Sequence, residues 1–346
     1  MATSVSDLDT RPREQVCVPG AANGPEELLI TARRVPLGKT AEVARALPDR
    51  QVRMIGAWCF LDHYGPEELG EQRGMQVWAH PHTGLQTVSW LLEGAIEHRD
   101  SLGSQALVRP GELNLMTAGR GIVHSEISRP DRPPRLHGVQ LWVALPDRVR
   151  DMPPAFAAYA ELPDLFDQSR EVDPLEPPTG GRAERRTGVH GTVLLGELQG
   201  VRSPAEVHTR ICGADVQLDS GGAVTLSLDP AFEHGIFVVS GVVTVEHSAV
   251  AVDQLLYLGT GRSEVSLRSD HGARLILLGG EPFGEEIVMW WNFIGRSHDD
   301  VVGYRSAWER RDPRFPPVVD RAEKVMEAPP LPTVTLKPRP RQAGLA

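Results

Sequence analysis

The stretch WAHPHTGLQTVSWLLEG, residues Trp78–Gly94, carries the main prediction about the fold. Two histidines, His80 and His82, alternate with a proline, a turn follows, and a run rich in β-formers ends at Gly94. Side chains of a strand point alternately to its two faces, so both imidazoles are expected on one face. They are either two solvated side chains at the mouth of a strand or half of a metal site. The stretch alone leaves both readings open.

Short apolar runs of the same kind recur from Leu28 to Pro146, among them WCFLDHYG, LNLMTAG, IVHSEIS and VQLWVALP. They are bounded by Gly, Pro and Asp and show no sustained helical period, which is typical of a sandwich or barrel. A second series runs from TVLLGELQGV to ARLILLGG. SWLLEGAIEH and FVVSGVVTVEH are both strand, glycine, strand segments that end at a histidine. Two copies of one β-domain explain this likeness, and chance similarity between two hairpins is the alternative.

These patterns predict an all-β protein with two barrels and a few short helices. Ser297 and Asp300 form an S-x-x-D capping box that opens a helix to about Arg310. The expected parts are a loose arm (1–27), a metal-binding N-terminal barrel (28–150), a short helix and linker (151–189), a C-terminal barrel with its closing helix (190–310) and a Pro-rich tail (311–346) that is extended and mobile from Ala328.

Composition excludes several classes of protein. The net charge of −10 and the lack of a Lys/Arg run argue against direct binding of nucleic acid. The three cysteines are widely spaced, which predicts reduced thiols rather than a disulfide framework or a zinc finger. No signal peptide is evident, and no run reaches the about 18 apolar residues that cross a bilayer. We therefore expect a cytoplasmic protein with no membrane association.

A second alternating pair, His124 and Glu126, strengthens the metal reading of His80 and His82. Strands of a small barrel face one another across its interior, so the two pairs can supply four ligands to one ion. Three imidazoles and a carboxylate suit Fe, Mn, Co, Ni or Cu and tolerate Zn. Without thiolates, the set does not look like a closed structural zinc site.

The remaining histidines carry weaker signals. Those in the first series without an alternating histidine partner are expected to be structural or surface residues: His63, His98 and His137. In the second series, Glu246 and His247 are adjacent and so point to opposite faces, which predicts a second barrel without metal.

Gly74, the His80-Pro-His82 motif and the strand that ends at Gly94 resemble the first motif of the cupin superfamily. HPHTGLQTVSWLLEGAIEHRDSLG, followed by MTAGRGIVHSE and LHGVQLWVALP, resembles the pirin family in particular. The resemblance covers residues 28–310 and is denser in the first half. It implies two cupin barrels in one chain, with Fe(II) held in the N-terminal barrel at the positions of His80, His82, His124 and Glu126.

The resemblance also implies two alternative functions. Some pirins open the ring of quercetin with dioxygen, which would make a small aromatic or enediol compound the substrate. Others modulate transcription factors or metabolic enzymes, which would make a protein the partner. We expect a monomer, although no residue pattern fixes the oligomeric state.

One departure from the family pattern concerns Gln86, where pirins usually carry Glu. A carboxylate there could take the proton of a substrate hydroxyl, and an amide cannot. Gln86 therefore predicts weak, altered or absent dioxygenase activity, or else it is a hydrogen-bonding residue beside the ligands.

Overall fold

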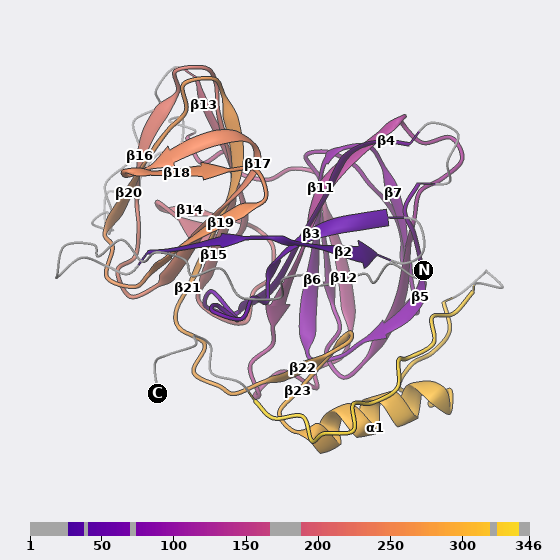
Figure 1. The fold of residues 1–346 in the computed structure, drawn as a ribbon. Helices are drawn as coiled ribbons and strands as arrows, with labels where there is room; N and C mark the ends of the chain where they lie inside the picture. The colour runs from indigo at the N-terminus through magenta and orange to yellow at the C-terminus, as the bar shows by residue number, and fades with distance from the viewer. Residues whose placement is uncertain (1–26, 38–40, 70–73, 167–187, 319–323, 339–346) are drawn as a thin grey trace, which may run out of the picture.

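A computed structural model describes residues 27–37, 41–69, 74–166, 188–318 and 324–338. Two β-structures stand side by side in it, and a short hairpin and a helix lie below one of them (Figure 1). The predicted all-β fold with two β-domains is confirmed. The expected arm and most of the expected linker lie outside the described residues.

The first half consists of two sheets that face each other. The seven-stranded sheet has the order β12-β9-β6-β11-β4-β3-β2, and the four-stranded sheet has the order β5-β10-β7-β8. The strands of the larger sheet are β2 (Arg33–Leu37), β3 (Ala41–Leu47), β4 (Trp58–Glu68), β6 (Leu85–Glu93), β9 (Leu113–Thr117), β11 (Arg135–Ala144) and β12 (Ala155–Tyr159). Those of the smaller sheet are β5 (Gln76–His82), β7 (Ile96–Asp100), β8 (Gln105–Val108) and β10 (Ile122–Ile127).

The second half is one ten-stranded sheet that bends around its own apolar core. Its main path is β1-β19-β17-β21-β15-β13-β14, and three further strands pair off this path. Its strands are β1 (Leu28–Thr31), β13 (Val189–Leu198), β14 (Val201–Arg202), β15 (Ile211–Leu218), β16 (Ala223–Ser227), β17 (Glu233–Val245), β18 (Ser248–Ala251), β19 (Gln254–Gly259), β20 (Glu264–Arg268) and β21 (Ala273–Gly280).

The two halves share a continuous hydrophobic core, to which both contribute buried side chains. Two tryptophans of the first half reach into the second. Trp58 Nε1 donates to the carbonyls of Cys212 and Gly279, each at 3.1 Å, and Trp90 Nε1 donates to Asp215 Oδ2 at 2.8 Å. Buried indoles need such partners, so these bonds fix how the halves meet.

Strand β6 lies between the interior of the first half and the second half, and is buried along Leu85–Leu92. Ser89 points inward, where its hydroxyl bonds Glu126, whereas Trp90 points toward the second half. Residues two apart share a face, so Gln86 lies on the face of Trp90. This alternation decides the role of Gln86 below.

The sequence predicts a short helix after Asp151, and that prediction is wrong. Residues Ala155–Tyr159 form β12, which pairs antiparallel with β9 along its whole length. A five-residue segment beside an open sheet edge gains a full row of backbone hydrogen bonds by adding a strand. An isolated helix of that length would not be stable in water.

The place of β1 in the sequence suggests that it belongs to the first barrel, but β1 does not join that barrel. It pairs with β19 of the second half, with Leu28 opposite Tyr257 and Thr31 opposite Gln254. The next strand, β2, pairs with β3 of the first half. The first strand of the described residues therefore belongs to the sheet of the second half.

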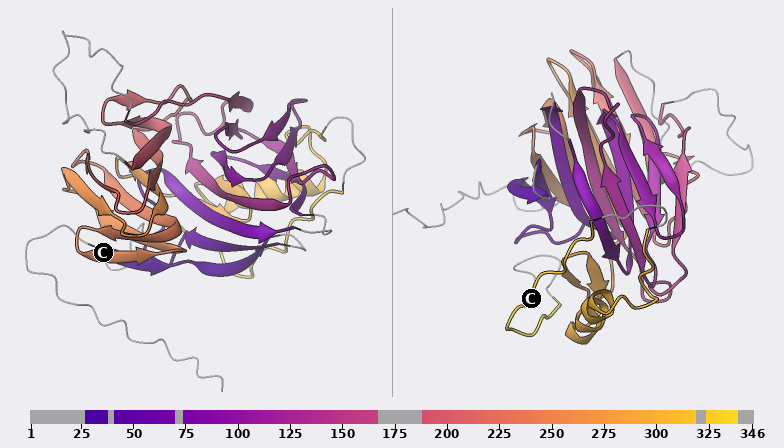
Figure 2. Two further views of the ribbon diagram at one scale, coloured as in Figure 1. Left: turned by 90° about the horizontal axis from the view of Figure 1, so that it is seen from above. Right: turned by 90° about the vertical axis from the view of Figure 1, so that its right-hand side faces the viewer.

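After β21, the chain returns to the first half. Strands β22 (Val288–Trp290) and β23 (Phe293–Gly295) form a hairpin, and α1 (His298–Glu309) follows (Figures 1 and 2). Phe293, Tyr304 and Ala307 pack with Ala79 and Val123 of the first half. The helix therefore closes the first barrel rather than the second.

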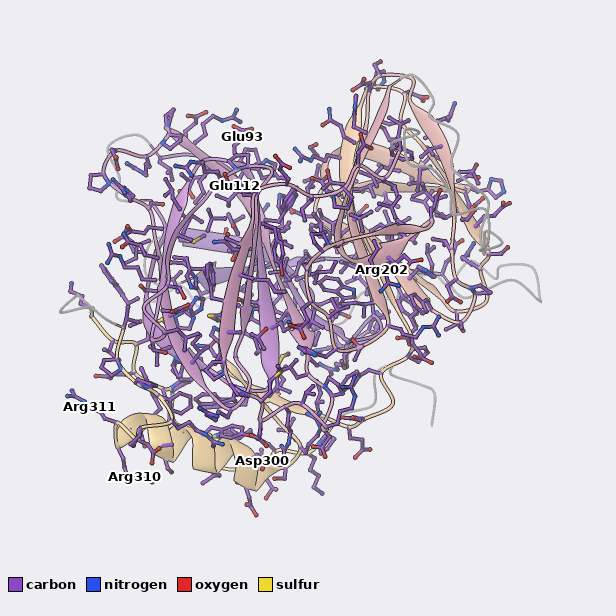
Figure 3. The ribbon with its side chains drawn as sticks, turned by 180° about the vertical axis from the view of Figure 1, so that it is seen from behind. Glu93, Glu112, Arg202, Asp300, Arg310 and Arg311 are labelled. Carbon is purple, nitrogen blue, oxygen red and sulfur yellow. The ribbon has the colours of Figure 1, made fainter. Side chains whose placement is uncertain are left out.

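The predicted capping box is confirmed at the start of α1. The Ser297 hydroxyl accepts from the Asp300 amide, and the Asp300 side chain accepts from the Ser297 amide. Asp300 in the first turn complements the positive end of the helix dipole, and Arg310 and Arg311 lie just beyond the other end (Figure 3). Within the described ranges, no helix is both long and apolar enough to cross a bilayer.

Residues 324–338 form an extended strap that is hydrogen-bonded to the first half. Ala79 of β5 donates to Lys324 O at 3.2 Å and accepts from the Met326 amide at 2.8 Å. Trp308 Nε1 bonds Met326 O at 3.0 Å, and the Leu336 amide bonds His298 Nδ1 at 3.1 Å. The strap is thus fixed to both α1 and the histidine strand.

Candidate metal centre

Strands β5 and β10 bring three of the predicted ligands together. The two strands pair antiparallel with His124 directly opposite His80. His80 Nε2 lies 3.0 Å from His82 Nε2, and the ring of His124 lies 4.5 Å from that of His80 and 4.9 Å from that of His82. One ring nitrogen from each of the three lies within 4.8 Å of the other two, a spacing that could hold a metal ion.

The fourth predicted ligand, Glu126, lies beside this cluster. An irregularity in the β5–β10 pairing between His124 and Glu126 places Glu126 opposite Val77. The carboxylate is buried and accepts a hydrogen bond from Ser89 Oγ at 2.9 Å. It forms a second group of ligand-type atoms within 4.8 Å, together with His124 and His98.

The role of His98 is missed in the sequence reading, which takes it as a structural or surface residue. His98 is buried opposite Glu126 on β7, and its Nδ1 lies 3.4 Å from His124 Nδ1. Its Nε2 lies 3.2 Å from Asp100 Oδ2, and its ring stacks on Phe156. A signal was present, since His98 and Asp100 are themselves an alternating pair, although not one of two histidines.

Burial keeps the clustered imidazoles neutral, which is the form that binds metals. Desolvation lowers the pKa of His80 to about 4, and it holds the pKa of His82 and of His124 well below the usual range. The neighbouring imidazoles lower the last two further. Desolvation also raises the pKa of Glu126.

The donor set fits a first-row transition metal. His80 Nδ1 lies 2.7 Å from Trp78 O, and this contact places the proton on Nδ1 and leaves Nε2 with a lone pair. His124 Nε2 is buried with no hydrogen-bond partner in the described structure. Such an atom costs about 1–3 kcal/mol, and a cation at this place would remove that cost.

A cavity of about 420 Å³ opens onto the histidines and Glu126. Phe60 and Trp142 stack in its wall at 4.0 Å, and Arg45 covers the Phe60 ring at 4.5 Å while bonding both oxygens of Asp62 at 2.7 Å. The volume lies in the range of sites for small organic ligands. Part of the lining comes from the C-terminal hairpin and strap: Met289, Trp291, Asn292 and Met326.

Gln86 is not among the residues that line this cavity, which argues against the reading in which residue 86 acts on the substrate. Its Nε2 donates to Thr117 Oγ1 at 2.9 Å and to Glu206 O of the second half at 3.2 Å. The cause is the alternation along β6, which turns Gln86 away from the ligands. Trp90 lies on that same face as a core residue, and neither it nor Trp78 lines the cavity.

Comparison with known proteins places these features in a family. The Pirin family profile matches residues 40–143, and that of the Pirin C-terminal cupin domain matches residues 213–315. A protein of Pseudomonas aeruginosa named "Putative quercetin 2,3-dioxygenase" is 43% identical over 88% of this chain and 90% of its own length. A "Pirin-like protein" of Caulobacter vibrioides is 33% identical over 84% of this chain and 95% of its own.

A solved structure supports the same assignment. The crystal structure of quercetin 2,3-dioxygenase from Acinetobacter baumannii superimposes with a TM-score of 0.80, at 39% identity over 89% of this chain and 96% of that chain. Its fold, the two profile matches and the sequence identities agree with each other. This chain belongs to the pirin family.

Proposed function

We propose that this pirin holds one divalent transition metal through His80, His82, His124 and Glu126, and acts as a dioxygenase of the quercetinase type. Its substrates would be flavonols or related enediol-like aromatic compounds. The observation that carries the proposal is the place of the three neutral imidazoles, at the wall of a 420 Å³ cavity that also contains a stacked aromatic pair. The relatives named for quercetin dioxygenase support the substrate class.

The ion, when bound, would supply Lewis-acid polarisation of the substrate's hydroxyl and carbonyl oxygens and the redox chemistry that activates dioxygen. Fe(II) is the ion that the family resemblance implies, and Mn, Co, Ni, Cu or Zn would fit the same donors.

The protein's own residues would bind and orient the substrate. The Phe60–Trp142 pair offers an aromatic surface, and the Trp142 ring meets His82 edge-on at 5.2 Å, so a ring packed there lies next to the ligands. The Arg45 guanidinium and Asp62 are polar groups in the same wall. Desolvation raises the pKa of Tyr64 well above its usual range, so its phenol stays a hydrogen-bond donor in the cavity.

The position of Gln86 gives no support to the argument for a weakened enzyme. Because the amide points to Thr117 and Glu206, its substitution for Glu takes no base out of the cavity.

The test is anaerobic loading with Fe(II), followed by oxygen uptake on addition of quercetin. We expect the wild type to bind about one metal per chain and to consume oxygen. His82→Ala should lose both properties, whereas His271→Ala, at an exposed histidine, should retain them. Metal binding without oxygen uptake on quercetin or on simpler enediols would refute the enzyme and leave the metal site standing.

A further inference from the structure

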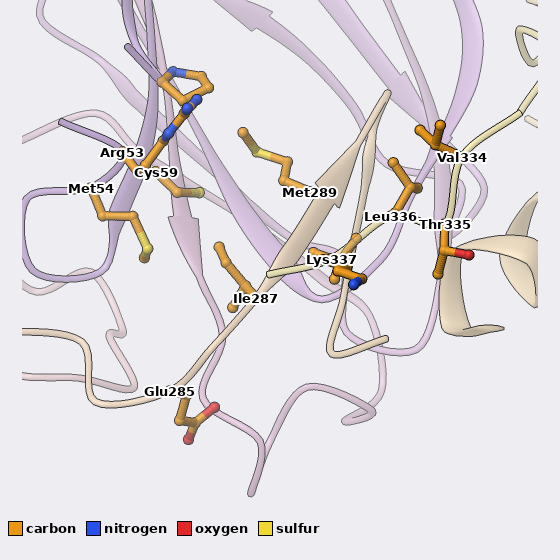
Figure 4. A pocket seen from close by; sticks show the side chains of 12 residues that line it. Arg53, Met54, Cys59, Glu285, Ile287, Met289, Val334, Thr335, Leu336 and Lys337 are labelled. Carbon is orange, nitrogen blue, oxygen red and sulfur yellow. The ribbon is translucent and has the colours of Figure 1, made fainter. Parts of the chain in front are cut away.

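A second cavity of about 420 Å³ lies next to the metal cavity and is not part of it. Its walls come from three places in the chain. Figure 4 shows Met54 and Cys59 on one side, Ile287 between, and the strap residues Leu336 and Lys337 opposite. Pro48 and Met289 line both cavities, so the two spaces share one wall.

The strap spans this space instead of filling it. The Leu336 amide is held by His298 of α1, and the side chains of Val334 and Leu336 border the cavity. Sites for small ligands measure about 300–1,000 Å³, and this cavity opens to solvent on the side of the strap, where Val334 is 66% exposed. An apolar space of this size under an anchored strap is therefore shaped for a ligand.

The charges at the cavity select the kind of ligand. Three charged residues line it: Arg53, Glu285 and Lys337. The Glu285 carboxylate is compensated, since it bonds Arg296 NH2 at 2.5 Å and the Asp147 amide at 2.9 Å. The Lys337 ammonium has no acidic partner among the described residues. The Lys337 ammonium therefore places a positive charge next to the apolar side chains of the lining.

We propose that this cavity binds a small amphipathic carboxylate, with its apolar body against Met54, Ile287 and Leu336 and its anionic group toward Lys337. The apolar wall provides affinity through burial of hydrophobic surface, and the Lys337 ammonium provides selectivity for an anion over its neutral isostere. The proposal does not rest on the dioxygenase function, because none of the metal-binding residues lines this space.

Calorimetric titration of the full chain, free of metal, with 4-phenylbutyrate tests the proposal, and 4-phenylbutanamide serves as the neutral isostere. We expect the acid to bind with a Kd near or below about 1 mM. The amide should bind about tenfold more weakly, as should the acid to Lys337→Gln, because each change removes one partner of a charge-assisted contact.

Two control variants locate the binding. Lys324→Gln makes the same change on the same strap, but outside the cavity, and should bind the acid like the wild type. His82→Ala disables the metal cavity and should also leave binding intact. Absence of binding, equal affinity for acid and amide, an unchanged affinity in Lys337→Gln, or loss of binding in His82→Ala would each overturn the proposal.

Discussion

At the scale of single residues, the Ser89 hydroxyl is the contact that orients the predicted carboxylate ligand. Ser89 Oγ lies 2.9 Å from Glu126 Oε1 and 3.0 Å from Gln140 Oε1, all within the first half. Held by one oxygen, the carboxylate keeps the other for a cation. Groups that orient ligands in this way commonly matter for metal affinity.

Ser89→Ala should therefore weaken metal binding by about 10–100-fold, because the carboxylate loses its anchor while all proposed ligands remain. Competition with a chromogenic chelator measures the affinity. Ser203→Ala removes another buried hydroxyl, one that bonds Leu194 O in the second half, and should leave metal affinity unchanged. Equal affinities of the two variants would contradict the role of Ser89.

Gln86 provides a second residue-scale prediction. Gln86→Glu should create no new turnover and should lower the free energy of unfolding by about 1–3 kcal/mol, because the buried carboxylate cannot donate to Thr117 Oγ1 or to the Glu206 carbonyl. Urea unfolding and oxygen uptake measure the two effects. Gln217→Glu makes the same change at an exposed position and should be nearly neutral. A gain of activity in Gln86→Glu would show that residue 86 reaches the substrate.

The alternation of side chains along a strand explains why the sequence predicts the histidine cluster correctly but does not predict the position of Gln86. It predicts that His80 and His82 share a face, and the pairing of β5 with β10 brings His124 to them. The rule does not say which face of β6 is the cavity, because both faces of that strand are buried. For this reason the alternation rule alone does not predict which way Gln86 points. The residues that pack against each face of β6 determine it.

At the scale of elements, the strap acts as an extra edge partner of the histidine strand. Its contact with β5 is a short parallel bridge, Ala79 to Val325, directly beside His80. The Met326 side chain also lines the metal cavity. Residues more than 240 positions apart in the sequence thus form one wall of the site.

Met326→Pro should loosen β5, since proline lacks the amide that donates to Ala79 O. We expect faster hydrogen exchange at the Ala79 amide and a stability loss of about 1 kcal/mol. Met326→Ala keeps the amide and serves as the control for loss of the side chain. If exchange at Ala79 is the same in both variants, the backbone bridge has no role in holding the strand.

Local signals predict elements better than they predict partners. The capping box at Ser297 locates the start of α1 because it depends on residues three apart. Strand β1 pairs with a strand of the second half, and α1 packs on the first half. Both placements depend on which sheet edge or face is open in the folded molecule. Those contacts join residues far apart in sequence, and the segments' own patterns fit either half.

At the scale of the whole molecule, a buried polar cluster joins the halves beside their shared core. His63 Nδ1 lies 2.6 Å from Asp253 Oδ1, and His63 Nε2 lies 2.8 Å from His137 Nε2. Arg34 adds an ion pair to Asp253 at 2.6 Å. These histidines are structural, as the sequence predicts, and they tie β4 and β11 to the turn before β19.

This cluster predicts that acid weakens the fold. Desolvation lowers the pKa of His137 to about 4, and the neighbouring His63 and Arg274 add to the shift. Since the pKa in the folded state lies below the ordinary histidine value of 6.5, the unfolded chain takes up a proton that the folded chain does not as the pH falls from 6.5 to about 4. Stability is therefore highest above pH 6.5 and decreases through that window, by at most about 1.4 kcal/mol per pH unit for this one group.

Urea unfolding of the metal-free protein between pH 7.5 and pH 4.5 measures this slope. His137→Gln should flatten the pH dependence, because glutamine has no proton to gain, while the exposed-site variant His271→Ala should keep the wild-type slope. The other buried histidines with lowered pKa values contribute to the slope that remains: His80 and His234, at about 4, and His82 and His124, well below the usual range. If His137→Gln keeps the wild-type slope, His137 must accept a proton in the folded state as readily as in the unfolded state. The contact between the halves would then be retained when His137 is charged.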